Sequence, residues 1–386
     1  MKFFHLSDLH IGKTLNGYSL RENQEAALAK IVLAAGAERP DAILICGDVY
    51  DRTVPAGEAY TIFDTFLGNL SELKPAIPVF IIAGNHDSPE RLSYASGFLE
   101  RYHIHISVMP PQEQEEYLQK FTLKDEYGLV NFYLLPFTKP GYVRKLSDNE
   151  IDDYESAIRE IIKRESIQKG ERNVILSHQF YVGKSSSPET CESEQAVIMA
   201  GGLDKVSTEV LQDFDYAALG HIHGSQQVGQ KNIRYCGTPC KYSVSEEHHK
   251  KSITVVNLKE KGSDPELTFL PLDSIYDVRR VKGSLAEIIE QENEKTCHDY
   301  VSVTLTDEEE PYRFREQLGE IYDHLLEVRV DNTRTRQSLA QQDDEIKIVS
   351  PLETFEQFYE AVVHSEMSES ERAVMRQAIK EVEENH

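Results

Sequence analysis

The chain has 386 residues, 40% of them hydrophobic and 28% charged, and a formal net charge of −25. This composition is that of a globular protein, and the length allows one large domain with one or two smaller units. No run approaches the roughly 18 apolar residues that a membrane helix needs, and the start MKFFHLSDLH lacks the pattern of a signal peptide. We therefore expect a cytoplasmic protein that does not span a membrane.

The acidic charge bears on the class of ligand. Proteins that bind duplex DNA do so largely through Lys and Arg contacts to phosphate groups. A net charge of −25 is unfavourable for such binding. Either the substrate is not a nucleic acid, or bound cations and a basic partner protein supply the attraction.

Residues 1–272 are predicted to form a layered α/β domain. Short apolar runs alternate with amphipathic stretches, which is the pattern of strands and helices in such a domain. The apolar runs are KFFHL, DAILIC, PVFII, NVILS and DYAAL. Between the second and third runs, Phe63, Phe66 and Leu70 recur at the spacing of one helical face. Around residues 184–202 this periodicity is lost, which predicts a surface loop near the functional site.

Residues 273–340 are predicted to form a smaller α+β cap domain. The expected elements, in chain order, are strand 276–283, helix 284–291, strand 299–305, helix 311–322 and strand 324–330. Ser284 and Glu287 form a capping box at the start of the first helix, and Pro311 suits the first turn of the second. Such a unit is too small to carry much chemistry alone.

Residues 341–386 are predicted to form a polar linker and a C-terminal helical tail. Ser350 and Glu353 flank a proline at the start of the first expected helix, and Glu371 caps a second helix after Ser368. Both helices are acidic and amphipathic. Their apolar faces either pack on the rest of the chain or anchor a partner protein.

Polar side chains follow five of the predicted strands, at the point where each strand ends. Because the carboxyl ends of strands in an α/β sheet line one crevice, five separated segments can converge there. Each motif taken singly is weak, but five together indicate one shared site. The candidate residues are Asp8, His10, Asp48, Asp51, Arg52, Asn85, His86, His178, His221 and His223.

The residue types in this set indicate the kind of metal. No thiolate is among them, which disfavours structural zinc. Carboxylate, imidazole and an Asn carbonyl together suit divalent ions such as manganese or iron. About seven of these ten residues are candidate metal ligands, which is more than one ion needs. We therefore expect two ions, roughly 3.5–4 Å apart, which could grip a phosphoryl group.

The motifs SDLH, GDVYDR, GNHD, SHQ and GHIH, in this order, resemble those of the calcineurin-like binuclear metallophosphoesterases. The resemblance covers roughly the first 240 residues and implies a layered sandwich of two mixed β-sheets flanked by helices. Within the superfamily the chain looks most like the SbcD family, the nuclease subunits of a bacterial double-strand-break repair complex. The early first motif, the insert after GNHDSPERL, the small cap and the helical tail all fit that family.

The resemblance also implies a role for each site residue. Asp8, His10 and His223 would hold the first ion, Asn85, His178 and His221 the second, and Asp48 would bridge both. His86 would stabilise the transition state and protonate the leaving alkoxide.

Three neighbouring residues would have supporting roles. Asp51 matches a position that orients this histidine through a hydrogen bond in related phosphatases, although archaeal and eukaryotic nucleases have His there. Arg52 would contact phosphate, or is a solvated arginine at a strand end. Asp87 is expected to be the N-cap of a helix that begins at Ser88.

The function that the resemblance implies is a manganese-dependent DNA nuclease of DNA repair, recombination and replication, associated with the nucleoid. It would act as an exonuclease on duplex ends and as an endonuclease on hairpins and single strands. It would form a homodimer within a heterotetramer, with an SbcC-type, SMC-like coiled-coil ATPase bound by the C-terminal helices. Two alternatives are a phosphodiesterase or phosphatase for small substrates, which the acidic surface favours, and a non-catalytic interaction scaffold.

Overall fold

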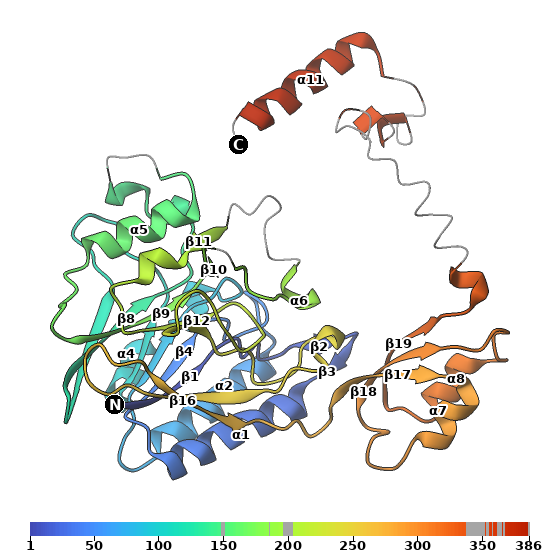
Figure 1. Cartoon of the computed structure of the whole chain (residues 1–386), viewed down its shortest axis with the longest axis horizontal. Coiled ribbons are helices and arrows are strands. Elements are labelled where there is room, and N and C mark those ends of the chain that lie inside the picture. The colour runs from blue at the N-terminus through green and yellow to red at the C-terminus, as the bar shows by residue number, and fades with distance from the viewer. Residues whose placement is uncertain are drawn as a thin grey trace.

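The computed structural model describes residues 1–147, 151–184, 186–195, 204–336, 352, 355–356, 358–360, 365 and 367–384. Its centre is a pair of six-stranded sheets that pack face to face (Figure 1). The first sheet has the order β16 (Glu266–Pro271), β15 (Ser252–Asn257), β1 (Lys2–Leu6), β4 (Ala42–Cys46), β5 (Val79–Ile82), β6 (Ile104–Ser107). The second has the order β13 (Gln226–Gln227), β14 (Ile233–Tyr235), β12 (Tyr216–Gly220), β9 (Arg172–His178), β8 (Gly128–Leu135), β7 (Gln119–Asp125).

Both sheets contain parallel and antiparallel strands. In the first sheet β1, β4, β5 and β6 are parallel, whereas β15 and β16 run antiparallel to their neighbours. In the second sheet β8, β9, β12 and β14 are parallel, and β7 and β13 close the edges antiparallel. The central strands are buried on both faces, which explains their continuous apolar runs.

Three apolar layers hold the sandwich together. Between the sheets, the ring of Phe3 packs edge-on against Phe132 and Tyr216, each with its centroid 5.7 Å away. Helices α1 (Arg21–Glu38) and α2 (Gly57–Ser71) cover the outer face of the first sheet, and α5 (Tyr154–Arg164) covers that of the second. The predicted face of α2 is buried. The expected sandwich of two mixed sheets flanked by helices is confirmed.

Short elements connect the layers. They are β2 (Thr14–Leu15), β3 (Tyr18–Ser19), α3 (Pro89–Leu92), α4 (Ser96–Leu99), β10 (Phe180–Val182), α6 (Glu192–Gln195) and β11 (Lys205–Ser207). The helix α6 lies within the stretch predicted to be a loop. Residues 185 and 196–202 of that stretch are outside the described part of the chain.

The cap domain is a parallel three-stranded sheet with two helices. Its elements are β17 (Val278–Gly283), α7 (Leu285–Gln291), β18 (Tyr300–Leu305), α8 (Phe314–Gly319) and β19 (His324–Val330). The capping box of Ser284 and Glu287 is present. The predicted helix over 311–322 was too long: α8 begins after Arg313, whose φ of 51° is left-handed and cannot continue a helix back to Pro311.

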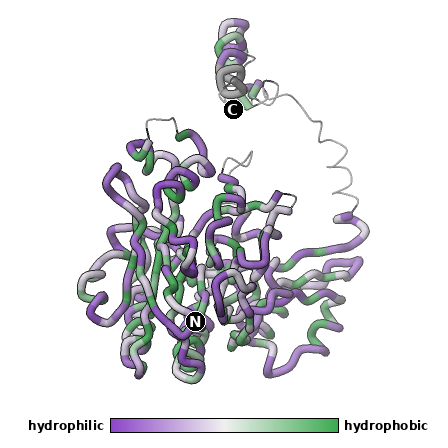
Figure 2. Tube along the Cα trace, turned by 60° about the vertical axis from the view of Figure 1, so that its left-hand side comes forward, coloured by the Kyte–Doolittle hydropathy of each residue, from purple (hydrophilic) through white to green (hydrophobic). Residues whose placement is uncertain are grey.

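The tail contains helix α11 (Glu369–Glu384), which lies away from the sandwich and the cap (Figure 1; Figure 2). The Ser368 backbone N–H donates to the Glu371 carboxylate at 2.8 Å, which confirms the predicted cap. Arg372 pairs with Glu356 of the preceding segment at 2.8 Å. Ser350 and Glu353 of the first expected helix are outside the described residues. Within the described part of the chain, no helix combines the length and the hydropathy needed to span a bilayer.

Candidate metal centre

The polar segments after β1, β4, β5, β9 and β12 meet at one end of the sandwich. Three of these strands belong to the first sheet and two to the second. The segments are held together by backbone hydrogen bonds between loops: the Asp8 N–H donates to the Gly47 carbonyl and the His10 N–H to the Asp48 carbonyl, both at 2.9 Å. The His221 N–H, after β12 of the second sheet, donates to the Asp8 carboxylate at 3.0 Å, so segments of both sheets come together.

Several site residues have left-handed backbones, which the sequence did not predict. The φ angles of Asp8, His10, Asp48 and His221 are 52°, 42°, 49° and 98°. Non-glycine residues in this region cost of order 1–3 kcal/mol each and occur mainly at functional sites, because the surrounding structure must hold them there. These turns aim the side chains of successive polar residues into one space.

One group of donors surrounds His10. Its Nε2 lies 3.7 Å from Asp48 Oδ2 and 4.0 Å from Asp8 Oδ1. The side chain is 2% exposed, yet neither ring nitrogen has a hydrogen-bond partner within the described structure. A buried polar atom without a partner is unfavourable. A cation bound beside Asp8 would satisfy Nε2, so these residues fit a metal ion.

A second group surrounds Asn85. Its amide oxygen lies 3.1 Å from His178 Nε2 and 3.0 Å from His221 Nδ1. His178 Nε2 is also 3.3 Å from Asp48 Oδ2 and 4.0 Å from Asp8 Oδ1. Asp48 thus lies between the two groups, where a bridging ligand would have to be.

His223 completes the first group. One of its ring nitrogens lies within 4.8 Å of ligand atoms of Asp8 and His10. Its Nδ1 points the other way, 3.0 Å from Ser193 Oγ and 3.4 Å from Glu246 Oε1. The structure therefore brings all seven predicted ligands together.

The charges in this group balance one another. Burial raises the pKa of Asp8, and burial also lowers the pKa of His10 well below its usual value. Burial alone would raise the pKa of Asp48 and lower that of His178, but their mutual attraction outweighs it: the pKa of Asp48 falls well below its usual value and that of His178 rises to about 9. The raised pKa values of Asp8 and His178 favour protons on these side chains. Divalent cations would replace those protons, because a metal ion displaces protons from its ligands.

His86 lies at the edge of the group. Its Nδ1 is 2.8 Å from the backbone carbonyl of Asp51, and its Nε2 is 4.0 Å from Asp48 Oδ2. The Asp51 contact to His86 is thus made by the main chain. The carboxylate of Asp51 lies 2.8 Å from Lys13 Nζ and 3.6 Å from His10 Nδ1. Arg52 is 74% exposed, with its Nε 3.6 Å from Asp51.

Asp87 is structural, but its predicted role as an N-cap was wrong. The cap of α3 is Ser88, which accepts a hydrogen bond from the Arg91 N–H. The buried carboxylate of Asp87 instead accepts from the N–H groups of Val49, Tyr50 and Gly84 at 2.9–3.1 Å. It thereby holds the loop that carries Asp48 against the loop that carries Asn85.

Four further residues at the site were not predicted from the sequence: Lys13, Ser193, Glu194 and Glu246. Glu194 accepts a hydrogen bond from the His223 N–H, and with Ser193 it covers the ligands from helix α6. The cavity left at the site holds about 10 Å³. The loss of periodicity after residue 184 was the only sequence signal for these α6 residues, and nothing marked Glu246.

Comparison with known proteins gives the family. Residues 1–225 match the family described as calcineurin-like phosphoesterase, and residues 276–363 match the one described as type 5 capsule protein repressor C-terminal domain. The chain is 30% identical over 331 residues to the SbcD subunit of the nuclease SbcCD from Staphylococcus epidermidis, covering 84% of each. It is 27% identical over 366 residues to the protein of the same name from Staphylococcus saprophyticus, covering 94% of this chain and 93% of that one.

Among solved structures, the chain is similar to TT1561 of Thermus thermophilus, with a TM-score of 0.41 and 12% identity over 70% of this chain and 99% of that one. The matches to the phosphoesterase family and to the two staphylococcal proteins together cover the sandwich and the cap. The chain therefore belongs to the calcineurin-like phosphoesterase family and, within it, to the group of the SbcD subunits of the nuclease SbcCD.

Proposed function

We propose that this nuclease family member hydrolyses the phosphodiester bonds of DNA with two divalent cations, and that these are Mn²⁺. The observation that carries the proposal is the convergence of seven side chains with oxygen and nitrogen donors. Among them is His10, whose buried ring nitrogens have no hydrogen bond within the described part of the chain. Carboxylate and amide oxygens mixed with imidazoles suit divalent ions such as manganese, and no thiolate is present to favour structural zinc. Bound cations also offset the repulsion between a phosphate backbone and a chain of net charge −25.

The two groups of donors suggest how the cations would be held. Asp8, His10 and His223 would hold the first, Asn85, His178 and His221 the second, and Asp48 would contact both. Such a pair supplies Lewis acidity to the phosphoryl group and to the attacking water. The protein contributes the fixed positions of these ligands, which its left-handed loops and the brace at Asp87 maintain.

His86 would handle the proton of the leaving group. Because a carbonyl oxygen only accepts hydrogen bonds, Nδ1 of His86 carries the proton that it donates to Asp51. Nε2 therefore faces the site and donates a proton only when the ring is an imidazolium. This ring is 28% exposed, within reach of substrate and of solvent that can reload it. Asp51 orients the ring, and its carboxylate faces His10 and Lys13 on the other side. Exposed Arg52 would contact a phosphate of the bound strand.

The relatives' name points to a complex, and we propose that this chain also joins an SbcC-type ATPase with long coiled coils. The apolar side chains of the tail support this: Phe358 is 61% exposed and Val374 is 71% exposed. An ATPase with basic DNA-binding surface would supply the attraction for DNA that this chain lacks.

Deletion of residues 350–386 should leave metal-dependent cleavage of simple substrates intact and abolish co-purification with the ATPase. Undiminished co-purification would assign the tail to packing within the chain.

We further propose that the chain is a homodimer within that complex. A groove of about 1050 Å³ between α2 and the α3–α4 segment is lined by Phe63, Leu67 and Phe98. At its rim Tyr94 is 83% exposed and Phe98 56% exposed, and large exposed apolar groups that cluster favour association. The variants Tyr94→Ser and Phe98→Ser should shift the mass measured by light scattering from dimer to monomer. Tyr312→Ser, which removes an 82% exposed ring in the cap, is the control and should stay dimeric.

A small-substrate phosphodiesterase is the second candidate, because the surface is acidic and the cavity at the site holds only about 10 Å³. A labelled linear duplex and a nitrophenyl phosphodiester separate the two. Each is incubated with Mn²⁺, Mg²⁺ or chelator, with and without the ATPase. Cleavage of the duplex with Mn²⁺ supports the nuclease. Cleavage of the small diester alone, even with the ATPase present, would favour the phosphodiesterase.

A further inference from the structure

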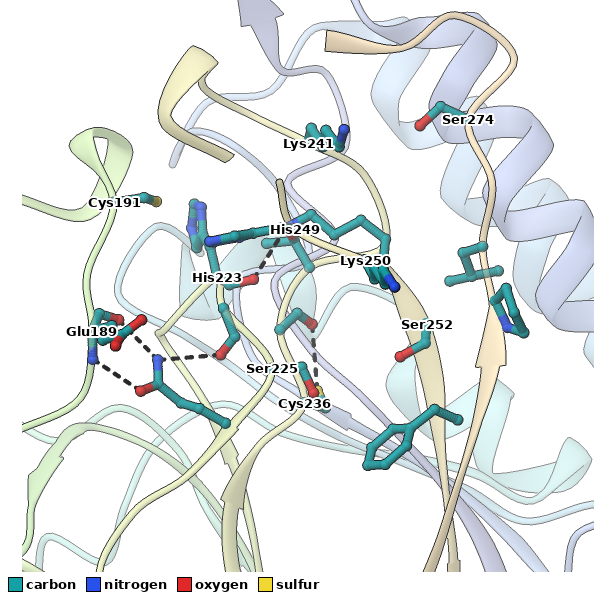
Figure 3. Close-up of a pocket in the computed structure, with 18 of the residues that line it drawn as sticks. Glu189, Cys191, His223, Ser225, Cys236, Lys241, His249, Lys250, Ser252 and Ser274 are labelled. Atoms are coloured by element: carbon teal, nitrogen blue, oxygen red, sulfur yellow. Dashed lines mark hydrogen bonds between the residues drawn. The ribbon is translucent and has the colours of Figure 1, made fainter. Parts of the chain in front are cut away.

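His223 lies between two cavities. On one side is the small space at the ligand cluster, and on the other is a cavity of about 1100 Å³ that His223 also lines (Figure 3). A ligand in this position needs a partner that holds it in one orientation.

Glu246 is placed to be that partner. Its Oε1 lies 3.4 Å from Nδ1 of His223. The Ser193 hydroxyl oxygen lies 3.0 Å from that Nδ1, and the hydroxyl donates to Glu246 Oε1 at 3.2 Å. The side chain is fully buried at the end of the short helical turn Val244–Glu246. The Tyr242 N–H and the Ser243 hydroxyl, each at 3.2 Å, also donate to Oε1. The carboxylate is therefore fixed by the fold.

Lys251 neutralises this carboxylate. Its Nζ lies 2.6 Å from Glu246 Oε2, and it donates to the His223 backbone carbonyl at 3.1 Å and to Thr238 Oγ1 at 2.6 Å. Lys251 is 8% exposed. A buried ion pair is weak evidence for stability, since desolvation of both charges offsets much of their attraction. This pair holds His223 at both its ring and its carbonyl, which indicates a role in positioning.

We propose that Glu246, with Lys251 as its counter-ion, is a positioning residue for His223. The carboxylate accepts the Nδ1 proton directly and through Ser193, so that the lone pair of Nε2 faces Asp8 and His10. Partners of this kind fix the tautomer and raise the basicity of a metal-binding histidine. The inference rests on the proposed two-cation centre and adds a residue outside the seven ligands.

The test is to measure Mn²⁺ binding by the Glu246→Gln variant. Titration calorimetry and the electron paramagnetic resonance signal of free Mn²⁺ both report this binding. The amide of Gln can donate to Nδ1 and so favour the wrong tautomer. We expect the affinity of one of two sites to fall about 10–100-fold, which is the usual cost of losing such a partner, while the other site keeps its affinity. Glu247→Gln is the matched control, because Glu247 pairs with Arg280 of the cap at 2.6 Å.

A double variant addresses the charge that Glu246→Gln leaves unpaired on Lys251. Glu246→Gln/Lys251→Met removes both charges and should show the same loss at a single site, with an unchanged circular dichroism spectrum. If both variants bind two Mn²⁺ ions as tightly as the control, the role of Glu246 is refuted while the metal centre stands. Weakening of both sites equally would assign Glu246 to general stability. If the wild-type chain binds no Mn²⁺, the proposed function itself fails.

Discussion

At the scale of single residues, the site is built from groups whose position matters more than their type. His5 and His10 show this, since both are buried histidines of the first segment. His5 has a partner for each ring nitrogen, Tyr216 and the Leu219 carbonyl, at 3.0 and 3.1 Å. His10 has none within the described structure. The first is a core residue with satisfied hydrogen bonds, and the second is fitted to hold a cation.

The substitution His86→Gln should preserve metal binding and remove cleavage. The side chain contacts Asp51 and faces Asp48, but it is not among the seven proposed ligands. Loss of general acid–base assistance lowers a rate by about 10²–10⁴-fold. Single-turnover cleavage and Mn²⁺ stoichiometry measure the two properties. His248→Gln, at a side chain that is 91% exposed, is the control. Cleavage at the wild-type rate would remove His86 from the mechanism.

His5 should make the protein less stable in mild acid. Burial lowers the pKa of His5 from 6.5 to about 3, so the folded state keeps it neutral. The unfolded chain binds a proton below pH 6.5, and stability is therefore full above that pH and falls as the pH drops toward 3. The loss is about 2 kcal/mol at pH 5. Urea unfolding of His5→Gln at about pH 7.5 and pH 5 should show a smaller decrease than the wild type. An equal decrease would contradict this.

At the scale of elements, glycines set how closely the strand ends approach. A Cβ at Gly84, after β5, would lie 2.1 Å from Asp48 Oδ1, and one at Gly220, at the end of β12, would lie 1.9 Å from the Cys46 carbonyl oxygen. Real Cβ atoms do not come so close. The sheets can therefore bring their loops to contact distance only because these positions lack side chains.

Gly84→Ala should separate the loops that carry Asp48 and Asn85. We expect a loss of Mn²⁺ affinity together with a lower melting temperature, because Asp48 must move away from the new methyl group. Gly68→Ala in α2 is a suitable comparison, since a Cβ there meets no atom of the described residues within 4 Å. That change should leave metal binding unaltered and stabilise the helix by up to about 1 kcal/mol. Normal Mn²⁺ binding by Gly84→Ala would show that the loops tolerate the shift.

At the scale of the whole molecule, the metal centre joins the two sheets. Asp8 and Asp48 belong to loops of the first sheet, whereas His178 and His221 belong to the second. A cation held by both sides would cross-link the sandwich at the end where buried carboxylates gather. Metal binding would therefore be coupled to the stability of the fold.

Mn²⁺ should raise the melting temperature, and chelator should lower it. A ligand that binds only the folded state at about 100 times its Kd stabilises it by about 2.7 kcal/mol. Differential scanning calorimetry with Mn²⁺ or with chelator measures the shift. The double variant Asp8→Asn/Asp48→Asn should show no response to Mn²⁺. A wild-type melting temperature that is indifferent to Mn²⁺ would argue against a cation across the sheets.

The strands, the candidate ligands at their ends and the general class of the site could be predicted from the amino-acid sequence. These depend on local patterns: apolar runs form strands such as β1 and β4, and polar residues such as Asp8 and Asp48 follow them directly. Local patterns also predicted the caps at Ser284 and Ser368. The helix predicted from the same patterns was longer than α8, because nothing in PYRF indicates the left-handed turn at Arg313.

The groups that surround the candidate ligands could not be predicted in this way, because they come together only in the folded chain. Glu246 and His223 are 23 residues apart, and Asp87 braces Val49 from 38 residues away. Such contacts depend on how two sheets and several loops pack, and no local periodicity encodes them. The main-chain contact of Asp51 to His86 likewise depends on a loop conformation that residue types do not reveal. Residue types show which side chains could bind a cation, whereas packing decides how they are held.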